Sequence, residues 1–307
     1  MSNITFEKFV LSKYENCLIV TDAKIAALYN ISGDNVYLIP QGEQAKSFRY
    51  VQELCSWFLS RKLSPKDKVV AVGGGSIGDT VGFATSIYKR GVDILHVPTT
   101  LLAQIDSSIG GKTAIDLDGV KNAVGTYHFG DTLIDVDFLK TLDEQQMLSG
   151  QGELIKYRMI CENVEKAYNN GKGSLAEVIK ACVYYKQYVC DTDPFCRDIR
   201  SMLNFGHTVG HALELSYGIA HGVAVANGIY YETLLAAKLD ICAREYADKW
   251  MKEVASKFKI YPLNGQILSL MVNDKKNMHG QVCFVLPDVF NEVYITLDEV
   301  KELLLHD

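Results

Sequence analysis

The chain has 307 residues, of which 48% are hydrophobic and 22% are charged, and its net charge is −6. This length is enough to bury a large core and suggests two domains. The acidic balance argues against a nucleic-acid-binding protein, and no apolar run approaches the roughly 20 residues of a membrane-spanning helix.

The eight cysteines are scattered along the chain and form no CxxC pair. Several lie in apolar periodic segments, where a free thiol packs as a small hydrophobic group. Residues 1–16 lack the basic and then apolar layout of a secretory signal. We therefore expect a reduced, cytoplasmic chain without a disulfide framework or a thiolate zinc site.

Up to residue 137, short apolar segments alternate with segments of helical periodicity. The predicted strands are 16–22, 35–40, 68–75, 94–100 and 132–137, and the predicted helices are 47–63 and 78–91. Strands that alternate with helices favour a parallel sheet with helices on its faces. We predict an α/β domain over residues 1–137.

From residue 138 the pattern becomes mostly helical. The predicted helices lie within 145–170, 174–190, 208–218 and 223–258, and the only extended segments are 281–287 and 292–297. We predict a second, mostly helical domain over residues 138–307. Because parallel sheets bind ligands beyond the carboxyl ends of their strands, and pockets favour domain interfaces, we expect the site between the two halves.

A glycine-rich loop follows the strand at 68–72. Residues 73–76 read Gly-Gly-Gly-Ser and lead into a predicted helix that carries Asp79. Glycines here let backbone N–H groups approach a pyrophosphate at a helix N-terminus, but a tight turn between strand and helix would look the same. An acid such as Asp79 is also favoured there by the helix dipole alone. Thr99 and Thr100 end the next strand, where hydroxyls suit a ribose or a nicotinamide amide but also cap helices.

The segment 106–125 is unusually polar and glycine-rich for a connection between apolar strands. It contains Asp106, Lys112, Lys121 and Asn122. Its composition is equally typical of a solvated loop and of a loop that binds a ligand.

A carboxylate and three histidines form the second polar constellation. Glu153 and Lys156 stand at i and i+3, so they share a helix face, and an ordinary surface ion pair would explain them. His207, His211 and His221 fall within fifteen residues. The spacing of His207 and His211 allows both to bind one metal from one helix face. Imidazoles with a carboxylate suit zinc or a similar divalent ion.

These residues stand within motifs that resemble the 3-dehydroquinate synthase family over nearly the whole chain. The motifs, in order, are GGGSIGD, YKRG, HVPTTLLAQIDSSIGGKTAI, KNAVG, GELIKY, RSMLNFGHTVGHALE, HG and NDKK. Glycerol dehydrogenase-like enzymes share GGGS with a downstream PTT. The run from Pro98 to Asn122 together with GHTxGHA is specific to the sugar-phosphate cyclases.

The resemblance implies a Rossmann-like NAD-binding domain, then a mostly helical domain that binds metal and substrate, with the active site between them. It implies Glu153, His207 and His221 as ligands of one divalent metal, zinc or cobalt. His211 would lie beside the metal, near the substrate, as a hydrogen-bonding and proton-handling residue. This differs from the pair of His207 and His211 that the spacing alone favours.

The resemblance also implies two sets of binding residues and a homodimer. The residues expected to contact NAD are Glu43, Lys46, Gly74, Gly75, Ser76, Ile77, Gly78, Asp79, Thr99, Thr100, Lys112, Lys121, Phe138, Leu139, Lys140 and Thr141. The residues expected to contact substrate are Arg90, Asp106, Lys112, Asn122, Lys156, Lys186, Arg200, His211 and Lys276. Arg90 resembles an arginine that reaches the substrate phosphate of a neighbouring subunit.

The implied reaction explains these residue types. NAD takes a hydride from a carbinol whose hydroxyl the metal polarises, phosphate is eliminated, the hydride returns, and an aldol step closes a carbocycle. A substrate with a phosphate and a carboxylate needs several lysines and arginines, even in an acidic protein. Sister cyclases that make 2-deoxy-scyllo-inosose or aminodehydroquinate, and polyol dehydrogenases of the glycerol dehydrogenase type, remain alternatives.

Three departures from the family pattern stand out. The family usually has a glutamate after HG, where this chain has Val223, and a glutamate near the position of Cys196. Because acids beside a metal ligand orient it, we expect His221 to be held less firmly than in relatives. The N-terminal part is also shorter than is usual in the family.

Overall fold

The computed structural model describes residues 2–170, 174–271, 280–288 and 290–305. The chain divides into two compact units, residues 1–147 and 148–307. This division lies beyond residue 137, where the sequence pattern changes. No described helix is both long and apolar enough to cross a bilayer.

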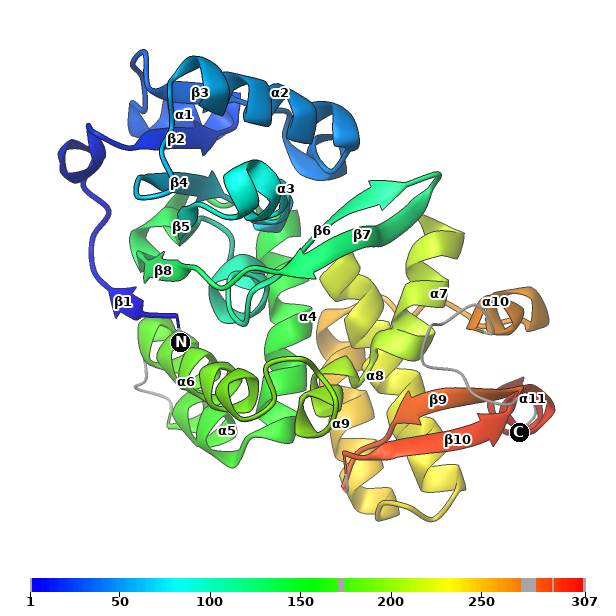
Figure 1. Cartoon of the computed structure of the whole chain (residues 1–307). Coiled ribbons are helices and arrows are strands. Elements are labelled where there is room, and N and C mark those ends of the chain that lie inside the picture. Colours follow the sequence, from blue (N-terminus) through cyan, green and yellow to red (C-terminus); the bar gives the residue numbers. More distant parts are fainter. Residues whose placement is uncertain (1, 171–173, 272–279, 289, 306–307) are drawn as a thin grey trace. The chain divides into compact units, whose positions relative to one another are not determined.

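The first unit is built on a six-stranded parallel sheet with the strand order β1-β8-β5-β4-β2-β3 (Figure 1). Its strands are β1 (Ile4–Phe6), β2 (Leu18–Thr21), β3 (Val36–Leu38), β4 (Lys68–Gly73), β5 (Asp93–Pro98) and β8 (Asp131–Ile134). The central strands β4 and β5 are mostly apolar and largely buried, as expected for strands whose two faces are both covered. The five strands and the parallel sheet that the sequence predicts are confirmed, whereas β1 was not predicted.

Helices connect the strands of this sheet. They are α1 (Ala23–Tyr29), α2 (Phe48–Ser60) and α3 (Gly75–Ile87). Helix α2 buries Val51, Leu54 and Phe58, which lie at helical spacing on one face. Together with apolar side chains of α3 and β4, they form one core cluster. The two predicted helices are thereby confirmed.

The polar segment after β5 forms a hairpin instead of an open loop. Strand β6 (Lys112–Leu117) pairs antiparallel with β7 (Val120–Tyr127). Asp118 and Gly119 join the strands with φ values of 50° and 79°, the two positive values of a type I′ turn. An Asp-Gly pair between Leu117 and Val120 is a strong hairpin signal, although the polar and glycine-rich composition of the whole segment 106–125 is also typical of a loop.

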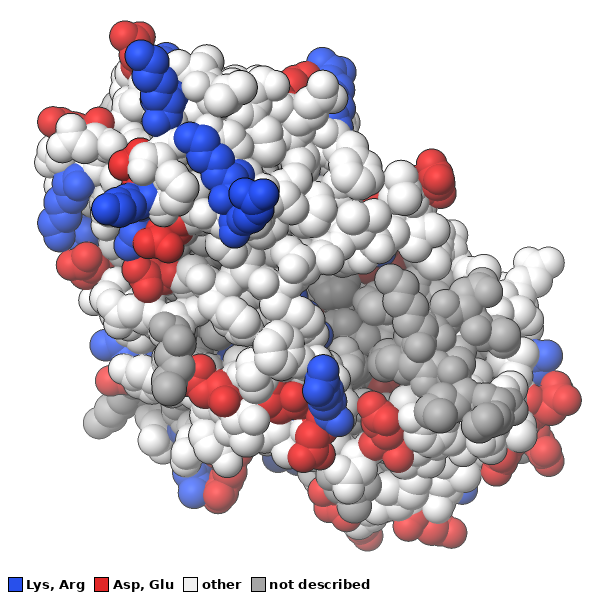
Figure 2. All heavy atoms as spheres, viewed as in Figure 1, with Lys and Arg blue, Asp and Glu red and all other residues white. Residues whose placement is uncertain are grey.

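The second unit is mostly helical, as predicted. Its helices are α4 (Glu144–Ile160, which starts in the first unit), α5 (Glu162–Asn169), α6 (Leu175–Thr192), α7 (His207–Tyr217), α8 (His221–Lys238), α9 (Arg244–Lys257), α10 (Gly265–Leu270) and α11 (Leu297–Leu305). Strands β9 (Gln281–Val285) and β10 (Glu292–Thr296) form an antiparallel pair, which confirms the two predicted extended segments. Acidic and basic side chains are interspersed over the described part of the face in Figure 2.

His96 on β5 is a titratable group inside the first unit. Its Nδ1 is buried without a hydrogen-bond partner among the described residues, and it lies against Gly78 and Gly82 of α3. Desolvation, with a contribution from nearby His128, lowers the pKa of His96 to about 4. His96 is therefore neutral in the folded chain at neutral pH.

We predict that His96 makes the stability of the chain fall in mild acid. Its pKa is lower folded than unfolded, so the unfolded chain binds the extra proton, and stability is lost as the pH falls from about 6.5 towards 4. The loss amounts to at most about 3 kcal/mol. Urea unfolding between pH 7 and 4.5 should show a smaller loss for His96→Gln than for the wild type. His128→Gln removes only the smaller contribution to the pKa of His96, so its loss should lie closer to that of the wild type; equal pH dependence in the wild type and His96→Gln would contradict the prediction.

Candidate active site

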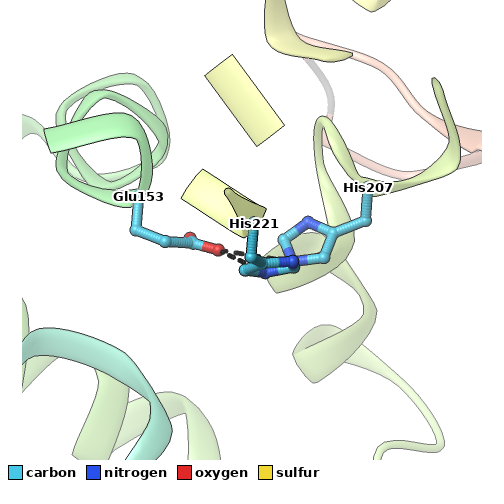
Figure 3. A group of neighbouring side chains, drawn as sticks. All are labelled: Glu153, His207 and His221. Carbon is cyan, nitrogen blue, oxygen red and sulfur yellow. Dashed lines mark ion pairs between the residues drawn. The ribbon is translucent and has the colours of Figure 1, made fainter. Parts of the chain in front are cut away.

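Glu153, His207 and His221 converge within the second unit (Figure 3). One ligand atom of each lies within 4.8 Å of the others. Both histidine Nε2 atoms are 3.4 Å from Oε1 of Glu153. Glu153 is fully buried, and neither of its oxygens accepts a hydrogen bond of normal geometry from the described residues. Two imidazole nitrogens aimed at one oxygen of a buried carboxylate form an arrangement that can hold a metal ion.

The opposite ring nitrogens fix how the two imidazoles face. His207 Nδ1 is 3.1 Å from the carbonyl oxygen of Phe205, and His221 Nδ1 is 3.0 Å from Oε2 of Glu214. A carbonyl oxygen and a carboxylate only accept hydrogen bonds, so each Nδ1 is the donor. In the neutral form of each ring, Nε2 then presents a lone pair towards Glu153, as a metal requires. Burial lowers the pKa of His221, but Glu153 and Glu214 outweigh it and raise that pKa to about 9, so a metal ion would displace a proton from this ring.

Lys156 neutralises the buried carboxylate. Its Nζ lies 2.5 Å from Oε2 of Glu153, and both side chains are almost fully buried. Burial favours the neutral form of Glu153, but the charges of Lys156 and His207 outweigh it and hold the pKa of Glu153 well below its usual value. Burial lowers the pKa of His207. Both effects favour an ionised carboxylate and a neutral imidazole, the forms that bind metals.

His211 lies beside the cluster but outside the set of possible ligands. Its ring centroid is 5.4 Å from that of His207 and 5.9 Å from that of His221, and its side chain is exposed. Spacing alone favoured His207 and His211 as the pair. The structure instead brings His207 and His221 to Glu153 from two different helices.

Close helix contacts beside each of the three residues position them. A Cβ on Gly152 would lie 1.8 Å from the carbonyl oxygen of Gly222, and a Cβ on Gly228 would lie 1.8 Å from that of Gly206. Glycine is required at such distances because any side chain would overlap the facing backbone. The first contact joins α4 to α8 beside Glu153 and His221. The second joins α8 to the start of α7, beside His207.

A buried acid on α8 holds the first turn of α7. The carboxylate of Glu232 accepts hydrogen bonds from the backbone N–H groups of Gly206 at 2.7 Å and Val209 at 3.1 Å. These are among the N–H groups that a helix start leaves unpaired. Glu232 thus fixes the backbone from which His207 projects.

In the first unit, the glycine loop lies at the N-terminus of α3. Gly74 precedes the helix without a side-chain cap, so the first N–H groups of α3 can bind an anion. A Cβ on Gly74 or Gly75 would approach the side chains of Thr100 and Ser107 to 3.1 and 3.0 Å. Gly78 and Ser76 follow in the same helix, while Ile77 is buried in the core.

Lys46 joins two predicted sets of residues. It is buried, its Nζ lies 2.7 Å from Oδ2 of Asp79, and it donates to Oδ1 of Asn122. Oε2 of Glu43 lies 4.0 Å from Nζ of Lys46. Burial lowers the pKa of Lys46, but the negative charges of Asp79 and Glu43 outweigh this effect and raise it. Asn122 was expected to contact substrate and the other residues NAD, and the structure places all four together.

The remaining residues expected to contact NAD differ in exposure. Thr100 accepts a hydrogen bond from the N–H of Ala103, so it caps a helical turn, and Thr99 is buried. Phe138 and Leu139 are buried, which leaves only their backbone for a ligand. The exposed residues of this set are Lys112, Lys121, Lys140 and Thr141, and the hydroxyl of Thr141 hydrogen-bonds to that of Tyr29.

Two residues expected to contact substrate lie on unusual backbone in the first unit. Asp106 is in a π-helical turn, Ala103–Ser107, a form frequent at functional sites. Arg90 is exposed and has a φ of 70°, next to Lys89 with a φ of 49°. Positive φ at such residues costs roughly 1 kcal/mol or more each and marks candidate functional positions.

The second unit buries three expected substrate contacts: Lys156, Lys186 and Arg200. Arg200 donates to the carbonyl oxygen of Pro194, and the carboxylate of Asp193 accepts its backbone N–H. Cys196, at the position of a family glutamate, lies in the same turn with a φ of 57°. Lys276 lies outside the described residues.

Sequence reasoning missed Glu214, Glu232 and the glycine contacts. Glu214 stands seven residues after His207, two helical turns on the same face, which is a usable signal. For Glu232 and the glycines, the pairing partners are far apart in sequence or on another helix, so no local pattern identifies them.

We predict that Gly152→Ala weakens metal binding by about tenfold or more, since it must separate α4 from α8 and move Glu153 away from His221. The crowded methyl group should also lower the free energy of unfolding by about 1–3 kcal/mol. Gly265→Ala, at the open first position of α10, is the control. Chelator competition measures the metal affinity, and urea unfolding measures the stability. Unchanged metal affinity in Gly152→Ala would show that the contact between α4 and α8 does not position Glu153 and His221.

Known proteins match the chain over most of its length. The family described as 3-dehydroquinate synthase N-terminal matches residues 36–149, and the family described as 3-dehydroquinate synthase C-terminal matches residues 150–277. The 3-dehydroquinate synthase of Dictyoglomus turgidum is 36% identical, covering 95% of this chain and 88% of that protein. The enzyme of the same name from Roseobacter denitrificans is 34% identical, covering 94% and 87%.

Solved structures share the fold. A 2-epi-5-epi-valiolone synthase from Streptomyces hygroscopicus with NAD+ and Zn2+ bound has a TM-score of 0.86 at 23% identity, covering 99% of this chain and 96% of that one. A 2-deoxy-scyllo-inosose synthase complexed with carbaglucose-6-phosphate, NAD+ and Co2+ has a TM-score of 0.85 at 24% identity, with the same coverage. The sequence matches over both units show that the chain belongs to the 3-dehydroquinate synthase family.

Proposed function

We propose that this chain is a 3-dehydroquinate synthase of the shikimate pathway, which leads to aromatic amino acids. It would convert 3-deoxy-D-arabino-heptulosonate 7-phosphate to 3-dehydroquinate and phosphate, as a carbocycle-forming phosphorus–oxygen lyase. The observation that carries the proposal is the convergence of Glu153, His207 and His221, in a chain that belongs to the family of that name.

We assign Glu153, His207 and His221 as the ligands of one divalent ion, zinc or cobalt. In a tetrahedral site with bonds of about 2.0–2.1 Å, neighbouring ligand atoms lie about 3.3–3.4 Å apart. Both Nε2 to Oε1 separations are 3.4 Å, so the residues fit such an ion. Three protein ligands leave a position open for substrate, as in catalytic sites. One structure of related fold has Zn2+ bound and another has Co2+ bound.

We assign the NAD site to the glycine loop and its neighbours in the first unit. The N-terminus of α3, without a side-chain cap, suits a pyrophosphate, and Glu43 and Ser76 are hydrogen-bonded beside it. Lys46 and Asp79 would lie at the same ligand. Once bound, the metal supplies polarisation of a substrate hydroxyl, and NAD supplies reversible acceptance of a hydride.

The chain's own residues would bind and orient an anionic substrate. The cationic side chains of Lys156, Lys186 and Arg200, all buried in the second unit, suit a substrate that carries a carboxylate and a phosphate. Lys156 also keeps Glu153 ionised. His211 is exposed beside the ligand rings, so it can exchange protons with substrate.

Two alternatives remain distinguishable. Sister cyclases are the first alternative, and a 2-deoxy-scyllo-inosose synthase of the same fold is complexed with carbaglucose-6-phosphate, which has no carboxylate. An iron-containing alcohol dehydrogenase from Thermotoga maritima shares the fold more distantly, with a TM-score of 0.63, so a polyol dehydrogenase is the second alternative. The sequence relatives named 3-dehydroquinate synthase favour the first proposal.

We predict phosphate release from 3-deoxy-D-arabino-heptulosonate 7-phosphate with NAD present far below the substrate concentration. The hydride returns within each cycle, so NADH should not accumulate in step with phosphate. Phosphate, absorbance of NADH and product identity are measured with added zinc or cobalt. NADH that accumulates one for one would assign the chain to the dehydrogenases. Turnover of glucose 6-phosphate alone would assign it to the other cyclases.

We also propose that the enzyme is a cytoplasmic homodimer in which Arg90 serves the active site of the partner subunit. Arg90 is exposed on a strained turn, and Lys89 fixes this turn by donating to the carbonyl oxygen of Leu63 at 2.6 Å. A strained, outward-facing arginine suits a phosphate on another subunit.

A mixture of two inactive variants tests this arrangement. Arg90→Ala and Glu153→Ala should each be inactive as homodimers, whereas a hybrid dimer contains one intact site. Random exchange of subunits should therefore restore about a quarter of wild-type activity, by two-fold symmetry. Activity is measured after co-refolding the two proteins. No recovery, with hybrid dimers demonstrated by mass, would place Arg90 in its own subunit's site.

A further inference from the structure

The surrounding residues hold the two candidate histidine ligands, His207 and His221, to different degrees. The side chain of His207 is only 13% exposed, and its Nδ1 donates to the backbone carbonyl oxygen of Phe205, two residues earlier. His221 is 35% exposed and stands at the first position of α8, where fewer neighbours surround it. Its orientation therefore depends more on a specific hydrogen bond.

We propose that Glu214 is a positioning residue for His221: its carboxylate accepts the Nδ1–H of the ring, fixes the tautomer and turns Nε2 towards Glu153. This inference rests on the proposed metal-dependent function. The contact between Nδ1 and Oε2 is 3.0 Å long, and the Glu214 side chain is only 9% exposed. A partly buried carboxylate cannot swing away to water as a surface acid can.

The chain path brings this pair together. Glu214 lies near the end of α7, and its carbonyl oxygen accepts the N–H of Gly218, which has a left-handed φ of 62° and ends the helix. The chain then reverses, and α8 begins at His221. The reversal places the last turn of α7 beside the first residue of α8, so the separation of seven residues becomes a direct contact.

The same geometry accounts for the absent family glutamate at position 223. Val223 packs against an apolar cluster that includes Ile155 and Phe205. Glu214 already occupies the acceptor position at Nδ1 of His221. His221 is therefore oriented by a carboxylate on α7, and the expectation that Val223 leaves it loosely held is set aside by this inference.

A purely structural role for Glu214, as a link between two helices, is the competing explanation. Removing the acceptor should change the metal site specifically, whereas removing a link should lower stability alone. Glutamine separates the two, because its amide oxygen can still accept the Nδ1–H although it carries no charge.

The test compares Co2+ binding by the wild type, Glu214→Ala and Glu214→Gln in the full chain. We expect Glu214→Ala to weaken Co2+ affinity by about 10–100-fold and to alter the cobalt absorption spectrum. Glu214→Gln should recover most of the affinity and the spectrum. Glu165→Ala removes another partly buried, ion-paired carboxylate of the same unit and should bind as the wild type does. Affinity is measured by chelator competition, and urea unfolding reports stability separately.

Three results would overturn the inference. Unchanged affinity and spectrum in Glu214→Ala would show that the contact does not position the ligand. If Glu214→Ala does not fold, a loss of Co2+ affinity of about 10–100-fold in a folded Glu214→Gln would show that the hydrogen-bond acceptor at position 214 does not position His221. Failure of the wild type to bind Co2+ would overturn both the metal site and this inference. Metal binding without formation of 3-dehydroquinate would overturn the proposed function only.

Discussion

The site in the second unit depends on how closely three helices can approach one another. Glu153, His207 and His221 each stand next to a glycine whose missing side chain lets a facing backbone come into contact. A carboxylate and two imidazoles have short reach, so their helices must meet at these points for the ligand atoms to lie within 4.8 Å. The geometry of the three side chains is thus a consequence of backbone contact.

Burying this much charge requires compensation, and the structure provides it locally. Lys156 and the two imidazoles surround the buried carboxylate of Glu153. Glu232 satisfies the N–H groups at the start of α7, and Glu214 satisfies the outer nitrogen of His221. Lys156 lies on the same helix as Glu153, whereas the imidazoles, Glu214 and Glu232 contact residues of other helices. Such networks are rigid when every member is satisfied, which suits a site that must keep its ligands in place through turnover.

In the first unit, groups from several elements likewise meet at one place, where they suit an anionic ligand. The N-terminus of α3 provides the positive end of a helix dipole, and the pair of Lys46 and Asp79 stands beside it. In the hairpin of β6 and β7, Asn122 accepts a hydrogen bond from Lys46. The same hairpin contains Lys112 and Lys121. A ligand at this loop would therefore contact residues from a sheet connection and a hairpin that are distant in sequence.

The sequence by itself determined the class of each half, because hydrophobic periodicity follows directly from burial on a strand or helix. It also identified the glycine loop and the acid and histidines of the metal site, since these residue types carry the chemistry. The spacing of the histidines left open which two of them share Glu153, and the resemblance indicated His207 and His221; the tertiary structure brings these two together because α8 meets α4 and α7 at glycines. It also decided that Glu232 holds the start of α7 and that Lys46 contacts Asn122. These outcomes depend on which surfaces meet in space, and no local pattern of residues encodes a contact between segments that are far apart along the chain.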